Sequence, residues 1–308
     1  MQEKKGVVYL ALVFSMIFWA FSFVWVKEVY VSYGPLTTVF FRLVIAAVLL
    51  FIYGKLTQKL IPVARADRKL FLLLAFFEPF LYFMGESYGL KYVSSTVGAI
   101  IVATIPLFSP FAASRFHGEK LSFRNFIGIV ISFAGVSLVV FDSSFNLTAS
   151  PLGIALEFLA VFSAIAYTVV LKDLAKKYNP TSIITYQNFI GIFYFLPFWL
   201  VFESNSLINT PFDATAFWGI VKLAFFASCI AFILYAYSVK TVGINDANMF
   251  INIIPVFTAL FAWYILDEAL TLRKLAGIGV VIAGLFIAQV KMKRSISKLV
   301  SIQQDGGR

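Results

Sequence analysis

The stretch IPLFSPFAASRFHGEKLSFRNFIGIVISFAG, residues 105–135, occurs a second time as IPVFTALFAWYILDEALTLRKLAGIGVVIAG, residues 254–284. The offset is 149 throughout, and 11 of the 31 aligned positions are identical. An apolar composition alone produces chance matches, but it does not place a proline, a glutamate, an arginine and two glycines in register. We interpret the stretch as an internal duplication.

Both copies predict two apolar helices joined by an acidic turn. The first helix carries an early proline, Pro106 or Pro255, and ends before Glu119 or Glu268. A serine or threonine three residues after each glutamate is a typical N-cap for the second helix. Because the helix dipole stabilises a carboxylate near a helix start by roughly 0.3–1 kcal/mol, we expect structural roles for the two glutamates.

The prolines and glycines of the duplicated stretch leave alternatives open. A proline frees a backbone carbonyl one turn earlier, and the resulting bend is either a simple kink or a hinge beside a cavity. Glycines spaced seven residues apart, Gly128 with Gly135 and Gly277 with Gly284, let another helix approach closely, and Ser132 shares the first surface. The partner helix belongs to the same chain or to a second copy, so the protein is expected to be a monomer or a homodimer.

The duplication extends over most of the chain. Nearer the start of each copy the offset is 145, where Lys27 matches Lys172 and Pro35 matches Pro180. One insertion of four residues explains the change of offset. Residues 1–148 therefore form one predicted repeat, and residues 149–308 form the second.

The composition is typical of an integral membrane protein. Of the 308 residues, 61% are hydrophobic and 13% are charged, against about 25% charged in soluble proteins, and the mean hydropathy is +0.90. The first apolar run is too long for a signal peptide. Apolar segments of spanning length predict ten transmembrane helices, five per repeat, at residues 7–27, 35–55, 70–90, 93–114, 122–141, 151–172, 180–202, 216–239, 245–266 and 272–290.

The net charge of +10 is distributed unevenly along the chain. With the N-terminus in the cytoplasm, the cytoplasmic loops and ends hold nineteen Lys and Arg residues and the outer loops hold four. Both termini are therefore expected in the cytoplasm, and no nucleic-acid partner is expected. Because five helices is an odd number, the second repeat is inverted relative to the first. Two inverted repeats can open one central site to alternate sides of a membrane, which favours secondary transport.

These motifs resemble the EamA family of the drug/metabolite transporter superfamily. The resemblance rests on the run YGLKYVSS from Tyr88 to Ser95, on the series from Pro106 to Gly135, and on its second copy, which is the closer match. The first copy departs from the family pattern at residues 114–117. The resemblance covers nearly the whole chain. It implies ten helices, a central cavity between the halves, and transport of small metabolites, often amino acids, without fixing the substrate.

Ionisable residues inside apolar helices are candidates for function, because inserting one costs about 2.5–3.5 kcal/mol. The chain has five of them: Arg42, Glu78, Glu86, Glu157 and Lys222. For Glu157 and Lys222, a snorkelling or paired structural charge is an equal alternative. Amides and phenols that complete a polar cavity wall, or that join helices to one another, are Tyr82, Tyr167, Tyr186, Gln187, Asn188, Asn248 and Asn252.

Glu78 is the strongest candidate for a substrate site. It lies about 12 Å into the third predicted helix, near the midplane of a ~30 Å hydrocarbon core. Tyr82 and Glu86 follow at i+4 and i+8, so the three form one polar stripe. Arg42 lies at nearly the depth of Glu86 and is expected to pair with it or to meet a zwitterion jointly with it. A buried carboxyl can exchange a proton, so proton coupling and a purely structural role of Glu78 are both open.

No cofactor, metal site or enzyme motif is predicted, because the sequence has no G-x-S-x-G, P-loop or H-E-x-x-H motif and only one histidine. The expected partners are the lipid bilayer and a small-molecule substrate. We predict an all-α secondary transporter that exports an amino acid or related metabolite by alternating access. Its expected location is the plasma membrane of a bacterium, the inner membrane if Gram-negative. The alternatives are a hydrophobic drug exporter, a passive channel and a non-transporting scaffold.

Overall fold

The computed structural model describes residues 2–117, 123–141, 147, 149–243 and 247–289, and apart from one isolated bridge these residues are helical or lie in turns and loops. Among these described residues, eight helical segments are long and apolar enough to cross a membrane, and residues 250–266 form a shorter apolar helix. The predicted class, an all-α membrane protein, is confirmed. The count of ten spanning helices stays a prediction.

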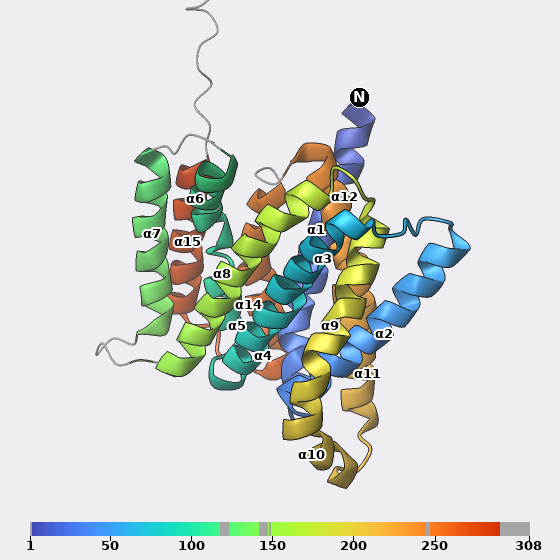
Figure 1. Cartoon of the computed structure of the whole chain (residues 1–308). Helices are drawn as coiled ribbons and strands as arrows, with labels where there is room; N and C mark the ends of the chain where they lie inside the picture. The colour runs from blue at the N-terminus through green and yellow to red at the C-terminus, as the bar shows by residue number, and fades with distance from the viewer. Residues whose placement is uncertain (1, 118–122, 142–146, 148, 244–246, 290–308) are drawn as a thin grey trace, which may run out of the picture.

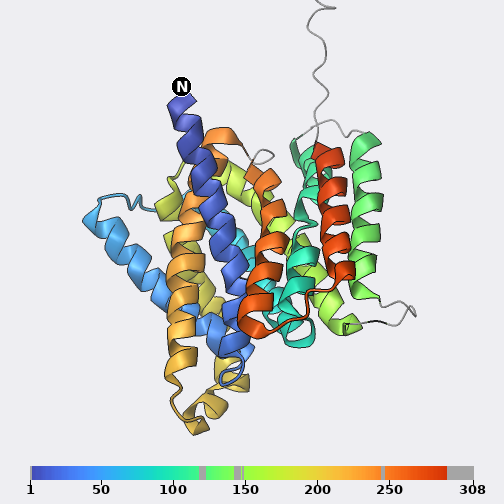
Figure 2. The same cartoon turned by 180° about the vertical axis from the view of Figure 1, so that it is seen from behind.

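The elements follow the duplicated order of the sequence (Figures 1 and 2). The first half contains α1 (Gln2–Val29), α2 (Pro35–Leu56), η1 (Arg65–Asp67), α3 (Arg68–Ala75), η2 (Phe76–Leu81), α4 (Tyr82–Tyr92), α5 (Ser95–Val102), α6 (Ile105–His117) and α7 (Phe123–Val140). The second half contains α8 (Pro151–Leu174), α9 (Pro180–Phe202), α10 (Ser204–Asn209), α11 (Ala214–Lys222), η3 (Leu223–Ala231), α12 (Phe232–Val242), η4 (Met249–Ile253), α14 (Ile254–Leu266) and α15 (Leu272–Gln289).

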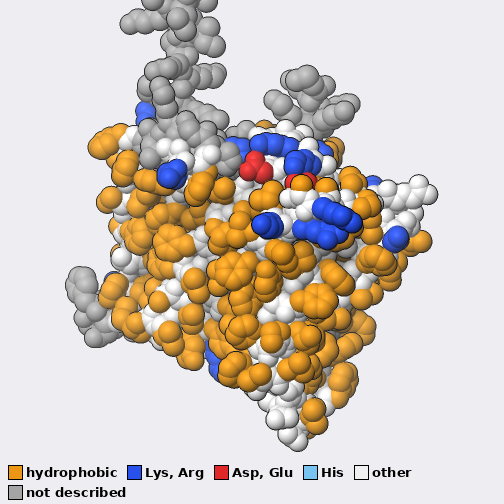
Figure 3. Space-filling model, viewed as in Figure 1, with side chains coloured by type: hydrophobic (Ala, Val, Ile, Leu, Met, Phe, Trp, Pro, Cys, Tyr) orange, Lys and Arg blue, Asp and Glu red, His pale blue; other side chains and the backbone are white. Residues whose placement is uncertain are grey.

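The surface of the molecule fits a lipid environment. In Figure 3 apolar side chains cover most of the visible face, and Lys and Arg gather along its upper edge. The start of α1 and the end of α15 lie at this same edge (Figures 1 and 2). Apolar side chains on a helix surface are stable against hydrocarbon and costly against water.

Two of the long helices are interrupted by π-helical segments, η2 and η3. In η2 the backbone of Glu78 is extended (φ −144°, ψ 118°), and Pro79 follows it. A proline disfavours helical geometry in the residue before it and cannot donate a backbone hydrogen bond, so the helix breaks here. Shifted by 149 residues, η2 falls at positions 225–230, inside η3. The two interruptions therefore occupy matching places in the duplicated sequence.

The two duplicated prolines stand at helix starts instead of bending continuous helices. Pro106 is the second residue of α6, and Pro255 is the second residue of α14. The first turn of a helix tolerates proline because its amide has no partner within the helix. Each proline thus begins a new helical piece after an interruption. Glu119, the first of the duplicated glutamates, lies outside the described residues.

The glycine surfaces of α7 and α15 pack against each other within one chain. A Cβ atom added to Gly135 would lie 2.7 Å from the Val281 nitrogen, and one added to Gly284 would lie 2.7 Å from the carbonyl oxygen of Gly128. The Ser132 hydroxyl donates to the carbonyl of Val281 at 3.1 Å. The predicted close approach is therefore made, and its partner is the matching helix of the other half.

Candidate functional site

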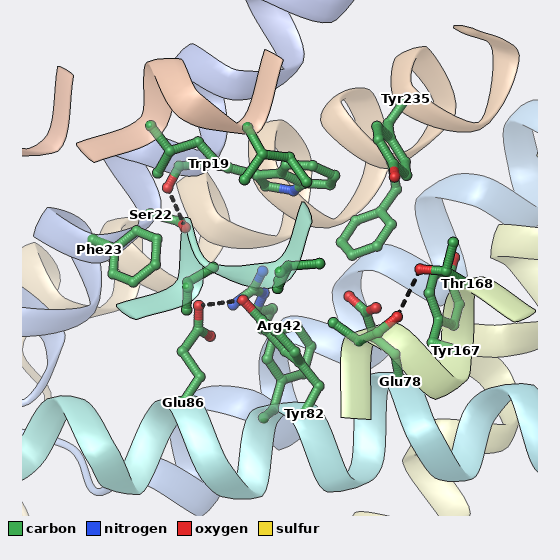
Figure 4. Close-up of a pocket in the computed structure, with 17 residues that line it drawn as sticks. Trp19, Ser22, Phe23, Arg42, Glu78, Tyr82, Glu86, Tyr167, Thr168 and Tyr235 are labelled. Atoms are coloured by element: carbon green, nitrogen blue, oxygen red, sulfur yellow. Dashed lines mark hydrogen bonds between the residues drawn. The ribbon is translucent and has the colours of Figure 1, made fainter. Parts of the chain in front are cut away.

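A cavity lies between the two halves of the chain, with about 650 Å³ of empty space including its opening (Figure 4). Its seventeen lining residues are Trp19, Ser22 and Phe23 of α1, Arg42 of α2, Glu78 of η2, Tyr82, Phe83 and Glu86 of α4, Val102 of α5, Ile105 of α6, Ala164, Tyr167 and Thr168 of α8, Phe232 and Tyr235 of α12, Ile251 of η4, and Ile254 of α14.

Most of the lining positions form pairs at the duplication offsets. Pairs that differ by 149 are Phe83 with Phe232, Glu86 with Tyr235, Val102 with Ile251, and Ile105 with Ile254; pairs that differ by 145 are Trp19 with Ala164, Ser22 with Tyr167, and Phe23 with Thr168. Three lining positions have no counterpart in the wall: Arg42, Glu78 and Tyr82. Most wall positions are thus repeated between the halves, whereas the charges of the wall are not.

Arg42 supplies the positive charge of the cavity. Its side chain is buried, its Nε donates to the Ser228 hydroxyl at 2.6 Å, and its guanidinium carbon lies 4.2 Å from the centre of the Phe83 ring. Among the described residues it has no other hydrogen bond and no ion pair. A guanidinium carries five N–H donors, so the remaining donors are free to bind an anionic group in the cavity.

Glu78, Tyr82 and Glu86 form the acidic side of the same cavity (Figure 4). The Tyr82 hydroxyl donates to Glu86 Oε1 at 3.1 Å, as the i+4 spacing predicts. The Glu78 carboxyl has no hydrogen-bond partner among the described residues. No ion pair joins Arg42 to Glu86 in that part of the chain, so the structure brings the two into the lining of one cavity without direct pairing.

Two further candidates lie behind the wall, each bonded to a lining tyrosine. The Tyr167 hydroxyl donates to Gln187 Oε1 at 3.1 Å, and the Tyr235 hydroxyl donates to Asn248 Oδ1 at 2.5 Å. These amides orient the phenols that face the cavity. Sequence reasoning missed Tyr235 as a site residue, although its offset of 149 from Glu86 is a signal that could have found it.

The remaining amide and phenol candidates are not in the cavity wall. Asn188 donates to the carbonyl of Ile184 within α9 at 2.8 Å. Asn252 is buried, and neither polar atom of its side chain has a hydrogen-bond partner among the described residues. Tyr186 lines a separate apolar groove between α2 and α9. Aromatic wall residues such as Trp19 were also missed, because a chain with 36 Phe gives no signal that singles one ring out.

Glu268 has a structural role, but with a different helix from the one expected. Its carboxylate accepts from the Ser95 backbone amide at 2.8 Å and from the Thr96 hydroxyl at 2.8 Å, so it caps α5 of the other half. Its own helix, α15, is capped by Thr271, whose hydroxyl accepts from the Lys274 amide at 3.2 Å. Glu268 therefore ties the two halves together at one end of the molecule.

A second polar contact between the two halves lies at the lower end in Figure 1. It joins the segment before α11 to the turn between α1 and α2. Asp213 accepts hydrogen bonds from the Ser32 hydroxyl and from the Thr215 and Ala216 amides. These donors, that of Ser32 first, hold the pKa of Asp213 below its usual range. The ionised form is thus fixed at the start of α11.

Three features together define a multi-pass membrane protein: the apolar surface, the long helices, and a buried cavity lined in part by charged side chains. A model of the EamA-like transporter family matches residues 6–141 and again residues 151–289. The chain belongs to this family, which confirms the resemblance seen in its motifs.

Individual relatives match over nearly their full length. An uncharacterized transporter of Bacillus subtilis, YdfC, is 29% identical over 276 residues, which cover 90% of this chain and 89% of YdfC. An uncharacterized transporter of Archaeoglobus fulgidus is 27% identical and covers 91% and 97%. A solved structure described as "Crystal structure of protein" aligns with a TM-score of 0.69 at 13% identity, covering 92% of this chain and 98% of that one. The last likeness concerns the fold alone.

Proposed function

We propose that this protein is a secondary transporter that exports a small zwitterionic metabolite, an amino acid or a related compound, by alternating access. One observation carries the proposal: Arg42, Glu78 and Glu86 line the same buried cavity, and most of the other wall residues are apolar or aromatic. Charged side chains inside a membrane protein are costly, so their convergence on one cavity favours a ligand with charges of its own.

Each charge of a zwitterion has a partner in this cavity. The free donors of Arg42 bind the substrate carboxylate, and charge-assisted hydrogen bonds of this kind are the strong ones. Glu78, which has no partner among the described residues, receives the ammonium group or a proton in exchange for it. Tyr82 holds Glu86 in place and leaves Glu78 as the acid that responds to the ligand.

The architecture we propose has ten spanning helices in two inverted repeats, residues 1–148 and 149–308. Three observations support it: the family model matches twice, fourteen of the seventeen wall positions are paired at the duplication offsets, and the Ser132–Val281 hydrogen bond joins two positions that are 149 residues apart. Contacts between equivalent positions are expected around a two-fold axis. Because basic residues gather at the edge that holds the start of α1 and the end of α15, we place the termini in the cytoplasm of a bacterial cell, which a reporter fused after residue 308 would test.

A second candidate function is export of hydrophobic drugs, which the aromatic wall favours, since Trp19, Phe23, Phe83 and Phe232 all face the cavity. Counterflow in proteoliposomes with labelled amino acids and labelled aromatic cations separates the candidates. A carrier exchanges its own substrate class, a channel shows no stimulation from the opposite side, and a scaffold moves neither compound.

Glu78→Gln tests the assignment of the central acid. In proteoliposomes we expect the variant to lose gradient-driven uptake of the amino acid identified by counterflow. Exchange persists if Glu78 only carries the coupling proton and is lost if it binds the substrate. Glu28→Gln, the same substitution in α1 outside the cavity wall, is the matched control and should behave as wild type. Wild-type uptake and exchange in Glu78→Gln would remove this residue from the mechanism.

A further inference from the structure

Glu157 of α8 is a buried acid that the central cavity does not use. Its side chain is 0% exposed, and neither carboxyl oxygen has a hydrogen-bond partner among the described residues. It is not part of the cavity wall. Buried polar groups in proteins are nearly always hydrogen-bonded, so this exception requires an explanation.

The Glu157 carboxyl is enclosed by the end of α4, the start of α5 and the turn between them, residues 89–98, called the α4–α5 turn below. A Cβ atom added to Gly89 would lie 2.7 Å from Oε1, and one added to Gly98 would lie 3.1 Å from it. A Cβ at Gly153, one turn earlier on α8, would lie 2.7 Å from the Val93 side chain, so α8 also lies directly against this turn. The glycines leave room for the carboxyl group and place carbon atoms, not donors, against it.

The charged groups around this turn are satisfied by other partners. Lys27 of α1 donates to the carbonyl oxygens of Leu90 and Val93, the latter at 2.7 Å. Glu86 of α4 accepts from Tyr82, and Glu268 accepts from the start of α5 and lies 3.7 Å from Lys274. None of these groups makes an ion pair with Glu157 in the described part of the chain. Lys27 is thus held by carbonyl oxygens and attracts Glu157 only from beyond ion-pair distance, so no donor contacts the Glu157 carboxyl in that part of the chain.

An ionised carboxylate in this position would lose its hydration without gaining donors, which disfavours the charged form. We propose that Glu157 is a proton-binding site separate from the central cavity, protonated while the α4–α5 turn lies on it and ionised only when the turn moves away. On opening, the carboxyl O–H bond breaks and the proton passes to water. A metal cation is a poorer occupant, since hard cations require several oxygen ligands and the glycine α-carbons supply none.

The coupling of this site to the transport cycle rests on the proposed function. Two side chains hold the α4–α5 turn in place. Lys27 of α1 donates to the Val93 carbonyl, and Glu268 of the second half accepts from the Ser95 amide. A movement that opens this end of the molecule must release the turn from Glu157 as well. Opening would therefore release a proton and closing would take one up, which links this end of the cycle to the proton gradient.

Infrared spectroscopy of the purified full-length protein in liposomes tests the site without any substrate. The wild type should show the carbonyl band of a neutral carboxylic acid at neutral pH that is absent from Glu157→Gln and kept in Glu28→Gln, the same substitution at an acid of α1 outside the cavity wall. Glu157→Leu should unfold at the temperature of the wild type or above it, because a neutral group without partners contributes no polar contact. A wild-type spectrum without a Glu157 band would overturn the proposal, as would a band abolished by adding sodium chloride at constant pH.

Transport measurements on the same variant distinguish a failure of this inference from a failure of the proposed function. In Glu157→Gln we expect counterflow exchange to persist and proton-driven uptake to be lost. A Glu157 band in a protein that moves no labelled amino acid would contradict the transport proposal and leave the proton site in place. Proton-driven uptake at the wild-type level in Glu157→Gln would overturn the coupling.

Discussion

The two interrupted helices, α3–η2–α4 and α11–η3–α12, have matching shapes and different chemistry. Both carry a π-helical segment at the same place in the duplicated sequence. The first presents Glu78, Tyr82 and Glu86 to the cavity, whereas the second has alanine at the first two matching positions and Tyr235 at the third. The backbone was kept in both copies, and the acids are found in only one.

The difference shows how a duplicated frame can hold an asymmetric ligand. Ser228 occupies the position that matches Pro79, and its hydroxyl holds Arg42 of the other half at 2.6 Å. The second interruption thus supports the positive charge, and the first supplies the negative ones. A zwitterion has unlike ends, so a cavity with fully symmetric walls would bind it less well than one in which the halves have diverged.

The largest effect, on substrate binding, is expected from Arg42→Gln. This substitution makes α2 resemble α9, where Gln187 stands at the position that matches Arg42. A hydrogen bond to a charged group contributes roughly 1.5–3 kcal/mol, so Arg42→Gln should weaken substrate binding by roughly ten- to hundredfold. Binding is measured as the ligand-induced shift in unfolding temperature, with the amino acid identified by counterflow. Ser228→Ala, which keeps the guanidinium and removes only its partner, should have a smaller effect. Equal binding by Arg42→Gln and wild type would contradict the assigned role.

The sequence predicted the charged residues of the cavity, with Tyr82 and Tyr167, and missed Tyr235 and the apolar and aromatic lining for identifiable reasons. Arg42, Glu78 and Glu86 were found because a charge in an apolar helix is costly enough to indicate function. Tyr186 and Asn188 of α9 could not be assigned, because a helix that is apolar nearly all round has no periodicity to show which face is interior. The partner of Glu268 could not be predicted either, because the capped residue Ser95 is 173 positions away in the chain.

A smaller effect, on stability alone, is expected from a substitution in the glycine contact between α7 and α15, which joins the two halves. In Gly135→Val the new side chain would be forced against the backbone of α15, since a Cβ at this position lies 2.8 Å from the carbonyl oxygen of Gly277. Overpacking of this kind costs about 1–3 kcal/mol, and the unfolding temperature in detergent should fall accordingly. Gly279→Val is the matched control, because a Cβ at Gly279 meets nothing within 4 Å. Similar losses in both variants would show that the glycine contact between the halves has no special role.

The smallest effect on stability is expected from substitutions at the starts of α2 and α9, which also match at the offset of 145. Helix α9 has its own cap, because Asn179 accepts from the Ser182 amide at 2.8 Å. Helix α2 has Gly34 at the matching position, and Glu203 from the other half accepts from the Thr37 amide at 2.7 Å instead.

A cap contributes typically about 1 kcal/mol, so Glu203→Ala and Asn179→Ala should each lower the unfolding temperature slightly. The two caps differ in whether a second substitution can restore the lost stability. A side chain at Gly34 would collide with Glu203, since its Cβ would lie 2.4 Å from the carboxyl carbon. Gly34→Asn should therefore destabilise the wild type, yet stabilise Glu203→Ala by giving α2 the local cap that α9 already has. If Gly34→Asn destabilises both backgrounds equally, the carboxylate of Glu203 is not the cap of α2.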